Sequence, residues 1–492
     1  MTSSSAPPSG EPSAELPGQA RVIRRPEPRP SRPARGWPLF ALLCLFPLWW
    51  ALGLSTFIFP ILAVPMALHL LRNRPVRVPP GFAIWLLFCV WMLVSLAMLP
   101  IDPPGTIAGS FNGRLVSVLL NLGEFAGVTV TLLYAGNLDT RIVPQRRIVG
   151  WLGLLFVYTV LGGLIALAAP RLAFTSPLEY LLPGSLRADP YIKAITHPAF
   201  AQVQAVLGYD APRPSAPWGY TNFWGNNLSL LLIWFVVGWW SLRKRGGRVF
   251  CAIVIMLAMV PVIYSLNRGL WLGLVLSGLY LVFRLVLMGR LGAVAIAAAV
   301  LLAGSFAFVA TPLGQTVTAR FQHGHSDNIR SFLNSRALDG ARSSPILGYG
   351  GTRKTQGSDK SITIGKTPKC PQCGNFAIGS TGQLWSLLFS HGFIGTGLFL
   401  GFFAYSGWRF RRDTSPIGIG GVLVVCLTFV YMFFYNSVPA ALTITMISIA
   451  LLWRNDLIRR AVPPGTADPD TADPDTADVL PERRPLRTHD HH

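Results

Sequence analysis

Residues 249–288 read VFCAIVIMLAMVPVIYSLNRGLWLGLVLSGLYLVFRLVLM, two apolar runs joined by the short polar segment Ser265-Leu266-Asn267-Arg268-Gly269. Each run is close to the roughly 20 residues that an α-helix needs to cross a bilayer. The stretch therefore predicts two successive membrane helices, with a single arginine in the turn between them.

The composition of the 492-residue chain excludes a soluble globular enzyme. Charged residues make up 13% and hydrophobic residues 51% of the chain, whereas a soluble domain carries about 25% charged residues. The 42 Lys and Arg exceed the 21 Asp and Glu, which gives a formal net charge of +21. Such an excess arises from basic cytoplasmic loops or from binding of an anionic ligand. The positions of the charges indicate both.

Apolar runs long enough for a membrane helix recur along the chain. We expect twelve spans, near 37–56, 57–72, 81–100, 114–136, 148–169, 223–242, 249–266, 269–288, 291–310, 382–407, 416–434 and 438–454. Basic segments precede the first span at 21–35 and follow every second span, at 72–77, 141–147, 243–248, 284–290, 409–412 and 454–460. Because positive charge marks cytoplasmic loops, both termini are predicted to be cytoplasmic. The fold class is therefore an all-α, polytopic protein of the inner or plasma membrane.

The two ends of the chain differ from the spans in composition. Residues 1–36 are rich in Pro, Ser and Arg and lack an apolar stretch, so we expect a disordered basic cytoplasmic arm and no signal peptide. Residues 455–492 contain a repeated T-A-D-P-D pattern, and such acidic low complexity does not form a core. The predicted organisation is an arm at 1–36, a transmembrane domain at 37–454 and a disordered cytoplasmic tail at 455–492.

Two long segments, 170–222 and 311–381, remain on the predicted outer side. The second carries nine Lys or Arg against three Asp, and 9 − 3 gives a balance of +6. Orientation in the membrane does not require positive charge here, although long loops are free to carry it. One explanation is a merely solvated surface. The other is an anion site at the outer membrane surface, because guanidinium groups suit phosphate oxygens.

Arg268 lies alone between two apolar runs on the same predicted side. A charge at a helix end can extend to the membrane interface, or it can face a cavity or a ligand. Since the basic segment 311–381 is on the same side, we expect a phosphate-bearing lipid as the ligand.

Three segments together carry a family pattern. The first is the S-x-N-R-G stretch at Ser265–Gly269, and the second runs from Arg330 to Gly350 and ends Pro-Ile-Leu-Gly-Tyr-Gly. The third runs from Gln383 to Gly395 and ends in G-x-x-G. In this order they resemble the bacterial O-antigen ligase and polymerase superfamily, in which the corresponding motifs are S-x-S-R-G, an arginine with a helical run before P-x-x-G-x-G, and an amphipathic stretch ending G-x-x-G. Asn267 stands where the family usually has a serine.

The resemblance implies a polytopic glycosyltransferase with a glycosyltransferase C-like architecture. It implies transfer, with inversion, from a polyprenyl-pyrophosphate-linked glycan donor to a hydroxyl of an envelope glycan or glycolipid acceptor on the extracytoplasmic face. No metal or other cofactor and no nucleic-acid partner is expected. A glycan polymerase of the same superfamily stays open as an alternative. So does a transporter of lipid-linked oligosaccharides, although charges gathered on one side favour an enzyme over a transporter with charges at the membrane midplane.

The resemblance also assigns roles to residues. Arg268 and Arg330 are expected to be catalytic, because guanidinium groups stabilise the charge that develops on a leaving pyrophosphate. The expected substrate-binding residues are Arg213, Asn222, Asn267, Arg320, Arg336, Thr381 and Gln383. The stretch before Asn222 is similar to the family's element ahead of the sixth helix.

One position departs from the family. Thr381 stands where the family usually has a histidine that is thought to bind or activate the acceptor, and a threonine is not a general base near neutral pH. The alternatives for that base are His323, His325, Asp327 and His391. A different acceptor is the other explanation.

Two cysteines of the outer segment stand apart from the four that lie in apolar runs. Cys370 and Cys373 are expected to form a small disulfide, because the outer side is oxidising. A zinc site with His323 and His325 is the alternative, although the two pairs lie far apart in sequence.

Overall fold

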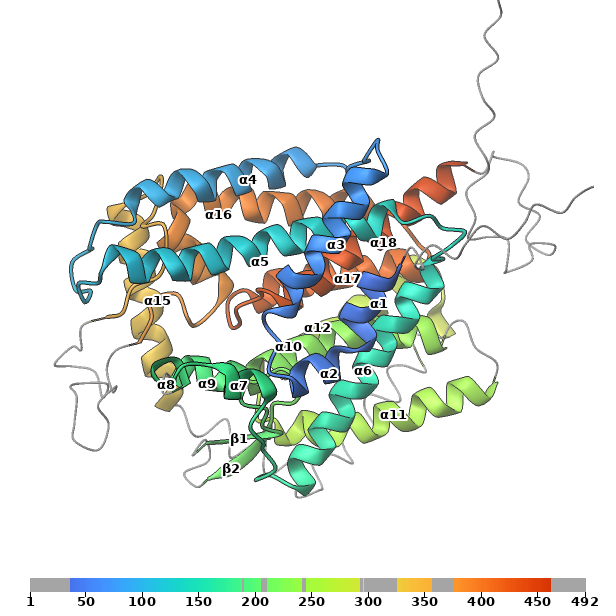
Figure 1. Cartoon of the computed structure of the whole chain (residues 1–492). Coiled ribbons are helices and arrows are strands. Elements are labelled where there is room, and N and C mark those ends of the chain that lie inside the picture. The colour runs from blue at the N-terminus through green and yellow to red at the C-terminus, as the bar shows by residue number, and fades with distance from the viewer. Residues whose placement is uncertain are drawn as a thin grey trace, which may run out of the picture. The chain divides into compact units, whose positions relative to one another are not determined.

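The computed structural model in Figure 1 is mostly helical. It describes residues 36–187, 190–204, 210–240, 245–292, 295, 325–355 and 376–461. The N-terminal helices are α1 (Trp37–Cys44), α2 (Phe46–Ala51), α3 (Ile58–Arg72), α4 (Phe82–Ser95), α5 (Phe111–Asn137) and α6 (Gln145–Ala168). They are followed by α7 (Pro177–Leu181), α8 (Gly184–Arg187), α9 (Pro190–Thr196), α10 (Thr221–Phe235), α11 (Arg245–Tyr264) and α12 (Arg268–Leu287). The last helices are α15 (His325–Ser343), α16 (Gln383–Phe410), α17 (Pro416–Tyr431) and α18 (Ala440–Ala461).

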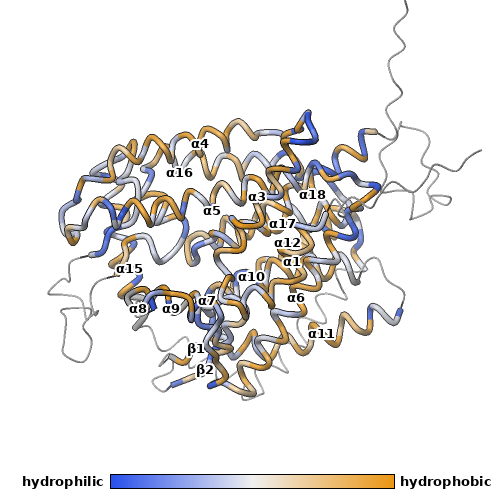
Figure 2. The backbone as a smooth tube through the Cα atoms, in the orientation of Figure 1, coloured by the Kyte–Doolittle hydropathy of each residue, from blue (hydrophilic) through white to orange (hydrophobic). Residues whose placement is uncertain are grey.

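Six described helices are long and apolar enough to cross a membrane, namely α5, α6, α11, α12, α16 and α18. Helices α3 and α17, and α4 with the 3-10 turn Leu96–Met98, are apolar but shorter. Many of their large apolar side chains are exposed, such as Leu87 at 56% and Met256 at 70%, and apolar surface on this scale indicates contact with lipid. Figure 2 shows hydrophobic residues along the helices and hydrophilic ones mainly in the connections. The predicted all-α, membrane-embedded fold is thus confirmed, while the number of twelve spans stays a prediction.

Individual spans differ from the prediction in their boundaries. The first, 37–56, is not one helix but α1 and α2, divided at Leu45. Pro47 in the first turn of α2 has no N–H to continue the hydrogen-bond ladder of α1. The last helix, α18, continues to Ala461, seven residues into the predicted tail, because Ile458 is buried and Arg459 pairs with Asp413. The predicted ninth span, 291–310, lies outside the described residues apart from 291, 292 and 295.

The helices pack in a way that buries aromatic residues. Helix α5 lies against α3 and α18, α10 against α6, and α16 against α4 and α15. Trp85, Trp224 and Trp234 are fully buried. The indole N–H of Trp224 donates to the carbonyl of Thr159 at 3.0 Å, and that of Trp234 donates to Ser448 Oγ at 2.9 Å. Each buried indole N–H of this pair therefore has an acceptor, as burial requires.

The two predicted outer segments form short helices, a hairpin and the helix α15. Segment 170–222 forms α7, α8, α9 and a two-stranded antiparallel hairpin, β1 (Ala201–Gln204) and β2 (Ala211–Pro214), with Ala201 opposite Pro214. The described part of 311–381 forms α15 and the loop 344–355. Strand β2 carries Arg213 and helix α15 carries Arg330, so these two segments bring arginines to the membrane helices.

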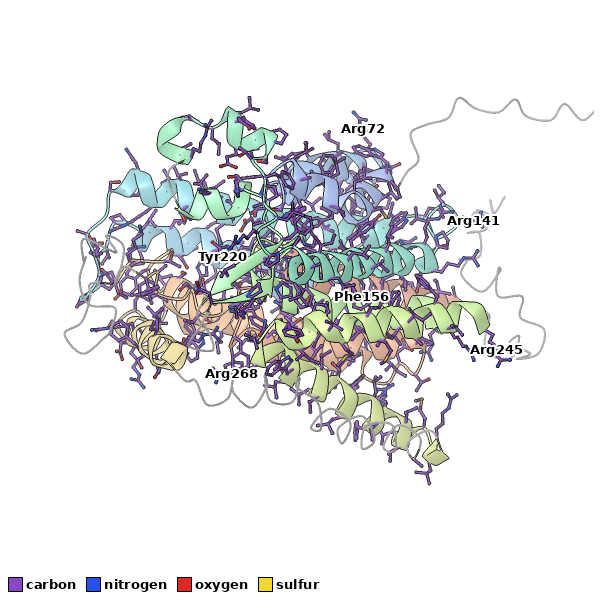
Figure 3. The ribbon with its side chains drawn as sticks, turned by 90° about the horizontal axis from the view of Figure 1, so that it is seen from below. Arg72, Arg141, Phe156, Tyr220, Arg245 and Arg268 are labelled. Carbon is purple, nitrogen blue, oxygen red and sulfur yellow. The ribbon has the colours of Figure 1, made fainter. Side chains whose placement is uncertain are left out.

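The long helices give the bundle two distinct ends. Figure 3 shows Arg72, Arg141 and Arg245 toward one end and Tyr220 and Arg268 toward the other. We name these the Arg454 end, because Arg454 donates to the carbonyl of Val143 near Arg141, and the Arg268 end.

Candidate functional site

The turn between α11 and α12 has a strained backbone. Leu266 is buried and has φ +53°, in the left-handed region that residues with a side chain seldom adopt. Asn267 then caps α12, and its Oδ1 accepts from the backbone N–H of Leu270 at 3.3 Å. Arg268 follows as the first residue of α12 and is half-buried. A strained turn with a capping amide therefore fixes the start of the helix that carries Arg268.

Asn267 connects this turn to two other segments. Its Oδ1 also accepts a hydrogen bond from the hydroxyl of Tyr435, which lies between α17 and α18. Its Nδ2 donates to the carbonyl of Thr221 at the start of α10, at 3.4 Å. Gly225 of α10 leaves room for this amide, because a Cβ there would lie 2.6 Å from Nδ2. The asparagine predicted in the S-x-N-R-G motif thus holds three segments together.

Tyr435 lies against the turn that carries Arg268. Gly269 packs directly against its hydroxyl, so both neighbours of Arg268 in the chain contact Tyr435. Burial raises the pKa of Tyr435 well above its ordinary value, and the positive charges of Arg330 and Arg213 lower that pKa by a smaller amount. The phenol is therefore neutral at ordinary pH and has two cationic side chains nearby.

Arg213 reaches this position from strand β2. Its side chain is buried, and its Nε donates to the carbonyl of Ser265 at 2.7 Å. This hydrogen bond links β2 to the S-L-N-R-G turn. Arg213, Asn267 and Arg268 are thus held in one arrangement by contacts between three segments. Their predicted roles in binding and catalysis stay predictions.

Arg330 is positioned by α15, which packs against α16. Ala337 of α15 is buried in a small cluster with Tyr349, Ile378 and Phe389. Gly340 allows this approach, since a Cβ there would lie 2.5 Å from the ring of Phe389. Arg336 lies on the same helix but in different surroundings. Its guanidinium lies over the ring of Phe332, 5.4 Å from the centroid, and beside Gly105.

The P-x-x-G-x-G loop pairs with the break in α16. Helix α16 is interrupted at Gly392, which has φ +64°. The N–H of Tyr349 donates to the carbonyl of Phe389 at 3.0 Å, that of Gly350 to Ser390 at 2.8 Å, and that of Phe393 to Pro345 at 2.8 Å. The loop therefore satisfies backbone groups that the helix break leaves open. Two of the sequence motifs meet here as one structural unit.

His391 lies inside this break. Its side chain is buried, its ring is edge-on to Phe88 at a centroid distance of 6.0 Å, and its carbonyl accepts from Trp91 Nε1 at 3.2 Å. Within the described ranges its Nδ1 has no hydrogen-bond partner. The structure places it against α4, in surroundings that differ from those of Tyr435.

Thr381 and Gln383 contact neighbouring segments. Thr381 Oγ1 donates to Asn334 Oδ1 on α15 at 2.6 Å. The backbone N–H of Gln383 donates to the carbonyl of Tyr435 at 2.9 Å, and its Oε1 accepts from the N–H of Ser437 at 3.1 Å. The structure thus places Thr381 against the helix of Arg330, and Gln383 against the loop of Tyr435.

The remaining predicted residues are placed only in part. Asn222 lies in the first turn of α10 beside Thr221, and the backbone of His325 and Asp327 lies in the first turn of α15. Arg320, His323, Cys370 and Cys373 lie outside the described residues. In the ranges that the structure does describe, no group of three or more His, Cys, Asp or Glu could hold a metal ion.

Sequence reasoning missed Tyr435 and the loop around it. Residues 432–434 continue the apolar run of α17 and belong to the predicted eleventh span, 416–434, and Tyr435 follows that span directly. The polar Asn436-Ser437 and Pro439 that follow were the available signal of a loop.

Comparisons of the chain with family models, with curated proteins and with solved structures give no match.

Proposed function

We propose that the protein is a polytopic glycosyltransferase that transfers a glycan from a polyprenyl-pyrophosphate carrier to a hydroxyl acceptor. The observation that carries the proposal is that the buried Arg213 is held by its Nε on the turn that carries Arg268, and that Tyr435 is hydrogen-bonded to Asn267 in the same turn. The positive charge of Arg330 also acts on Tyr435. Like charges gathered around a neutral group repel one another, and an anion between them removes that cost. A pyrophosphate with several oxygens is an anion that guanidinium groups bind well.

The proposed chemistry follows from these charges. The bond between the anomeric carbon and the pyrophosphate oxygen breaks, and the oxygen keeps the electron pair. The acceptor oxygen forms the new bond to that carbon and releases its proton to water. Arg268 and Arg330 stabilise the negative charge on the leaving pyrophosphate, an effect that depends on charges already in position. Asn267 and Tyr435 hold the turn of Arg268 in place.

The proposal includes the finer topology. Twelve spans with both termini in the cytoplasm place the Arg454 end, with its basic connections, on the cytoplasmic side. The Arg268 end then lies on the extracytoplasmic side of the inner or plasma membrane, in a glycosyltransferase C-like arrangement. The acceptor is an envelope glycan or glycolipid.

The experiment uses the full chain in liposomes, a labelled lipid-pyrophosphate-linked glycan from the host envelope, and host acceptor extract. Arg268→Ala and Arg330→Ala are compared with wild type, and transfer of label to a larger product is measured. Arg290→Ala beyond the other end of α12 and Arg342→Ala on the exposed side of α15 are the matched controls. We expect a loss of about 10²-fold or more in each test variant and none in the controls.

Two results would contradict the proposal. Label that crosses the bilayer still attached to its lipid would establish a transporter. Equal losses in the control and test variants would show that general positive charge, and not the arginines near Tyr435, is required. A product extended by repeated units, formed without an added acceptor, would identify the polymerase alternative.

A further inference from the structure

One face of helix α5 changes character along its length. At helical spacing it carries Ser117, Asn121, Glu124, Val128 and Ala135. Val128 and Ala135 are buried, and the carbonyl of Ala135 accepts from Arg454 of α18. This face is therefore the one that packs into the bundle, with α18 beside it, in the half of α5 toward the Arg454 end.

The contacts between α5 and α18 show where this packing ends. Gly136 lies against Trp453, since a Cβ on the glycine would overlap the indole ring. Both helices run from the Arg268 end to the Arg454 end, so counting back 12 residues from this contact brings 124 level with 441. Ala441 is the second residue of α18, whereas α5 begins at Phe111, 124 − 111 = 13 residues before Glu124. About 20 Å of α5 thus extends past the start of α18 (Figure 1).

Past the start of α18 the same face of α5 is polar. Ser117 and Asn121 are exposed and Glu124 is half-buried, and none of the three has a hydrogen bond or an ion pair among the described residues. Another face of this part of α5 is apolar, with Val116 61% and Leu119 54% exposed, as contact with lipid requires. An ionisable side chain in a membrane helix almost always faces the bundle interior or water. The three polar residues, here named the α5 polar stripe, therefore face the interior side of the bundle, where α18 no longer covers them.

The α5 polar stripe reaches the level of the arginine site. Glu124 is level with the start of α18, and the loop that leads into α18 carries Tyr435. Tyr435 is hydrogen-bonded to Asn267, the residue before Arg268. The carboxylate and the proposed pyrophosphate site are thus at the same depth in the membrane domain.

The chemistry of the α5 polar stripe suits a ligand with hydroxyl groups. A carboxylate accepts hydrogen bonds, an amide and a serine hydroxyl both donate and accept them, and sugar hydroxyls do the same. The negative charge of Glu124 repels a pyrophosphate, so the charged part of the donor is not the ligand here. A carboxylate also takes the proton of an attacking hydroxyl in general base catalysis. His391, by contrast, is buried in the break of α16.

We propose that the α5 polar stripe binds the hydroxyl-bearing acceptor glycan and that the Glu124 carboxylate is the base of the transfer. The acceptor hydroxyl donates a hydrogen bond to Glu124. Its oxygen bonds to the anomeric carbon while the pyrophosphate oxygen leaves with the electron pair, and its proton passes to Glu124, which then releases it to water. The proposal rests on the proposed function and adds to it the acceptor site and the base.

The test uses the full chain in liposomes, the labelled lipid-pyrophosphate-linked glycan and a dilution series of the host acceptor glycan. Glu124→Gln and Glu124→Ala remove the base, and Asn121→Leu removes the amide at similar size. Asp339→Asn, the loss of an exposed carboxylate on α15, is the control. The measurements are kcat, the KM for the acceptor, the Kd of the donor and thermal melting. Formate is added to Glu124→Ala as a substitute base.

We expect Glu124→Gln to lower kcat by about 10²-fold or more, the usual size of a general base effect. The donor Kd and the melting temperature should stay unchanged, and formate should restore part of the activity of Glu124→Ala. Asn121→Leu should raise the KM for the acceptor up to about tenfold, the effect of one lost hydrogen bond.

A folded Glu124→Gln variant with the kcat of wild type would overturn the inference. So would a weakened donor Kd with an unchanged KM for the acceptor, because the α5 polar stripe would then bind the donor glycan. Loss of transfer in Arg330→Ala but not in Glu124→Gln would leave the proposed function standing and reject the base. Absence of transfer in wild type would reject both.

Discussion

Arginines at the two ends of the bundle have different surroundings. At the Arg454 end, Arg284 donates to the carbonyls of Arg411 and Asp413, both at 2.6 Å. Arg454 donates to the carbonyls of Ala135 at 2.8 Å and Val143 at 2.6 Å. The carbonyls of Arg411, Asp413 and Ala135 lie in the last turn of a helix or just beyond its C-terminus, where positive charge is favourable, and that of Val143 lies in the loop before α6. The arginines of this end thus serve the structure.

At the Arg268 end, arginines gather around a neutral side chain. Arg213 and Arg330 both act on the hydroxyl of Tyr435, and Arg268 lies between two residues that contact it. The difference teaches that burial alone does not give the role of a guanidinium, since Arg213 and Arg454 are both buried. Arg213 also donates to a carbonyl just beyond a helix end, that of Ser265 after α11, and it differs from Arg454 in its position beside Tyr435 and the turn of Arg268.

The largest expected effects come from replacing one arginine at each end of the bundle, which should lower activity at one end and stability at the other. Arg330→Ala is expected to lower transfer by about 10²–10³-fold with little change in melting temperature. Arg454→Ala is expected to cost about 1–3 kcal/mol for each of the two carbonyls left without a donor. Transfer per folded molecule and thermal melting in detergent are measured for both. The comparison fails if Arg330→Ala melts as early as Arg454→Ala.

A second test concerns the break in α16 at Gly392, the helix on which α15 and Arg330 are packed. A Cβ at Gly392 would lie 2.6 Å from the carbonyl oxygens of Pro345 and Ile346, at φ +64°. Gly392→Ala is expected to destabilise the protein by more than about 1 kcal/mol. Gly397, in the same helix, has open space, so Gly397→Ala should stabilise it by roughly 0.5–1 kcal/mol. Equal melting temperatures of the Gly392→Ala and Gly397→Ala variants would contradict the helix break.

A third test separates two tyrosines that pack on α12. Tyr435→Phe removes the hydrogen bond to Asn267 and is expected to cost about 1 kcal/mol and to lower transfer by loosening the turn of Arg268. The Tyr431 hydroxyl lies near Ser229 and is not bonded to the turn of Arg268, so Tyr431→Phe should leave transfer nearly unchanged. If Tyr435→Phe and Tyr431→Phe have equal rates of glycan transfer, Tyr435 does not position the turn of Arg268.

The pH dependence of stability follows from the same hydroxyl. An unfolded tyrosine loses its proton near pH 10, whereas the folded protein holds the proton of Tyr435 to higher pH because burial raises its pKa. Above about pH 10 the unfolded state alone releases this proton, so stability falls as pH rises. In denaturation experiments, Tyr435→Phe should reduce the fall in the free energy of unfolding with rising pH above about pH 10. An unchanged fall would contradict the raised pKa of Tyr435.

The smallest expected effect concerns Arg336. Its guanidinium lies over Phe332 and beside Gly105, and such a contact is worth about 0.5–1 kcal/mol. Arg336→Gln should therefore change transfer by less than about fivefold, the change expected from a contact of this size. A loss as large as that of Arg330→Gln would place Arg336 in the pyrophosphate site.

Much of the fold was available from the sequence because lipid demands long apolar helices. The runs at 114–136, 148–169, 249–266 and 269–288 correspond to α5, α6, α11 and α12 within a few residues. The division at Leu45 was not predicted, although Pro47 was visible, because hydropathy alone does not report helix continuity. The break at Gly392 was missed for the same reason. The carbonyls of Phe389 and Ser390 beside the break accept hydrogen bonds from the 345–350 loop, which is distant in sequence.

The candidate site was predictable where motifs supplied the residues. Arg213, Asn267, Arg268 and Arg330 were identified from the sequence, and the structure brings their segments together. Tyr435 was not, because a tyrosine at the edge of an apolar run resembles an interfacial residue. Its importance depends on Asn267 and Gly269, which lie far away in the chain.

The pairing of the 345–350 loop with Gly392 has a consequence for biosynthesis. Phe389 and Ser390 need the N–H groups of Tyr349 and Gly350, so α16 is not a self-sufficient insertion unit. The loop is translated first, which makes its donors available when α16 enters the bilayer. Splitting the chain between the loop and α16 should yield two fragments that assemble only when they are expressed together.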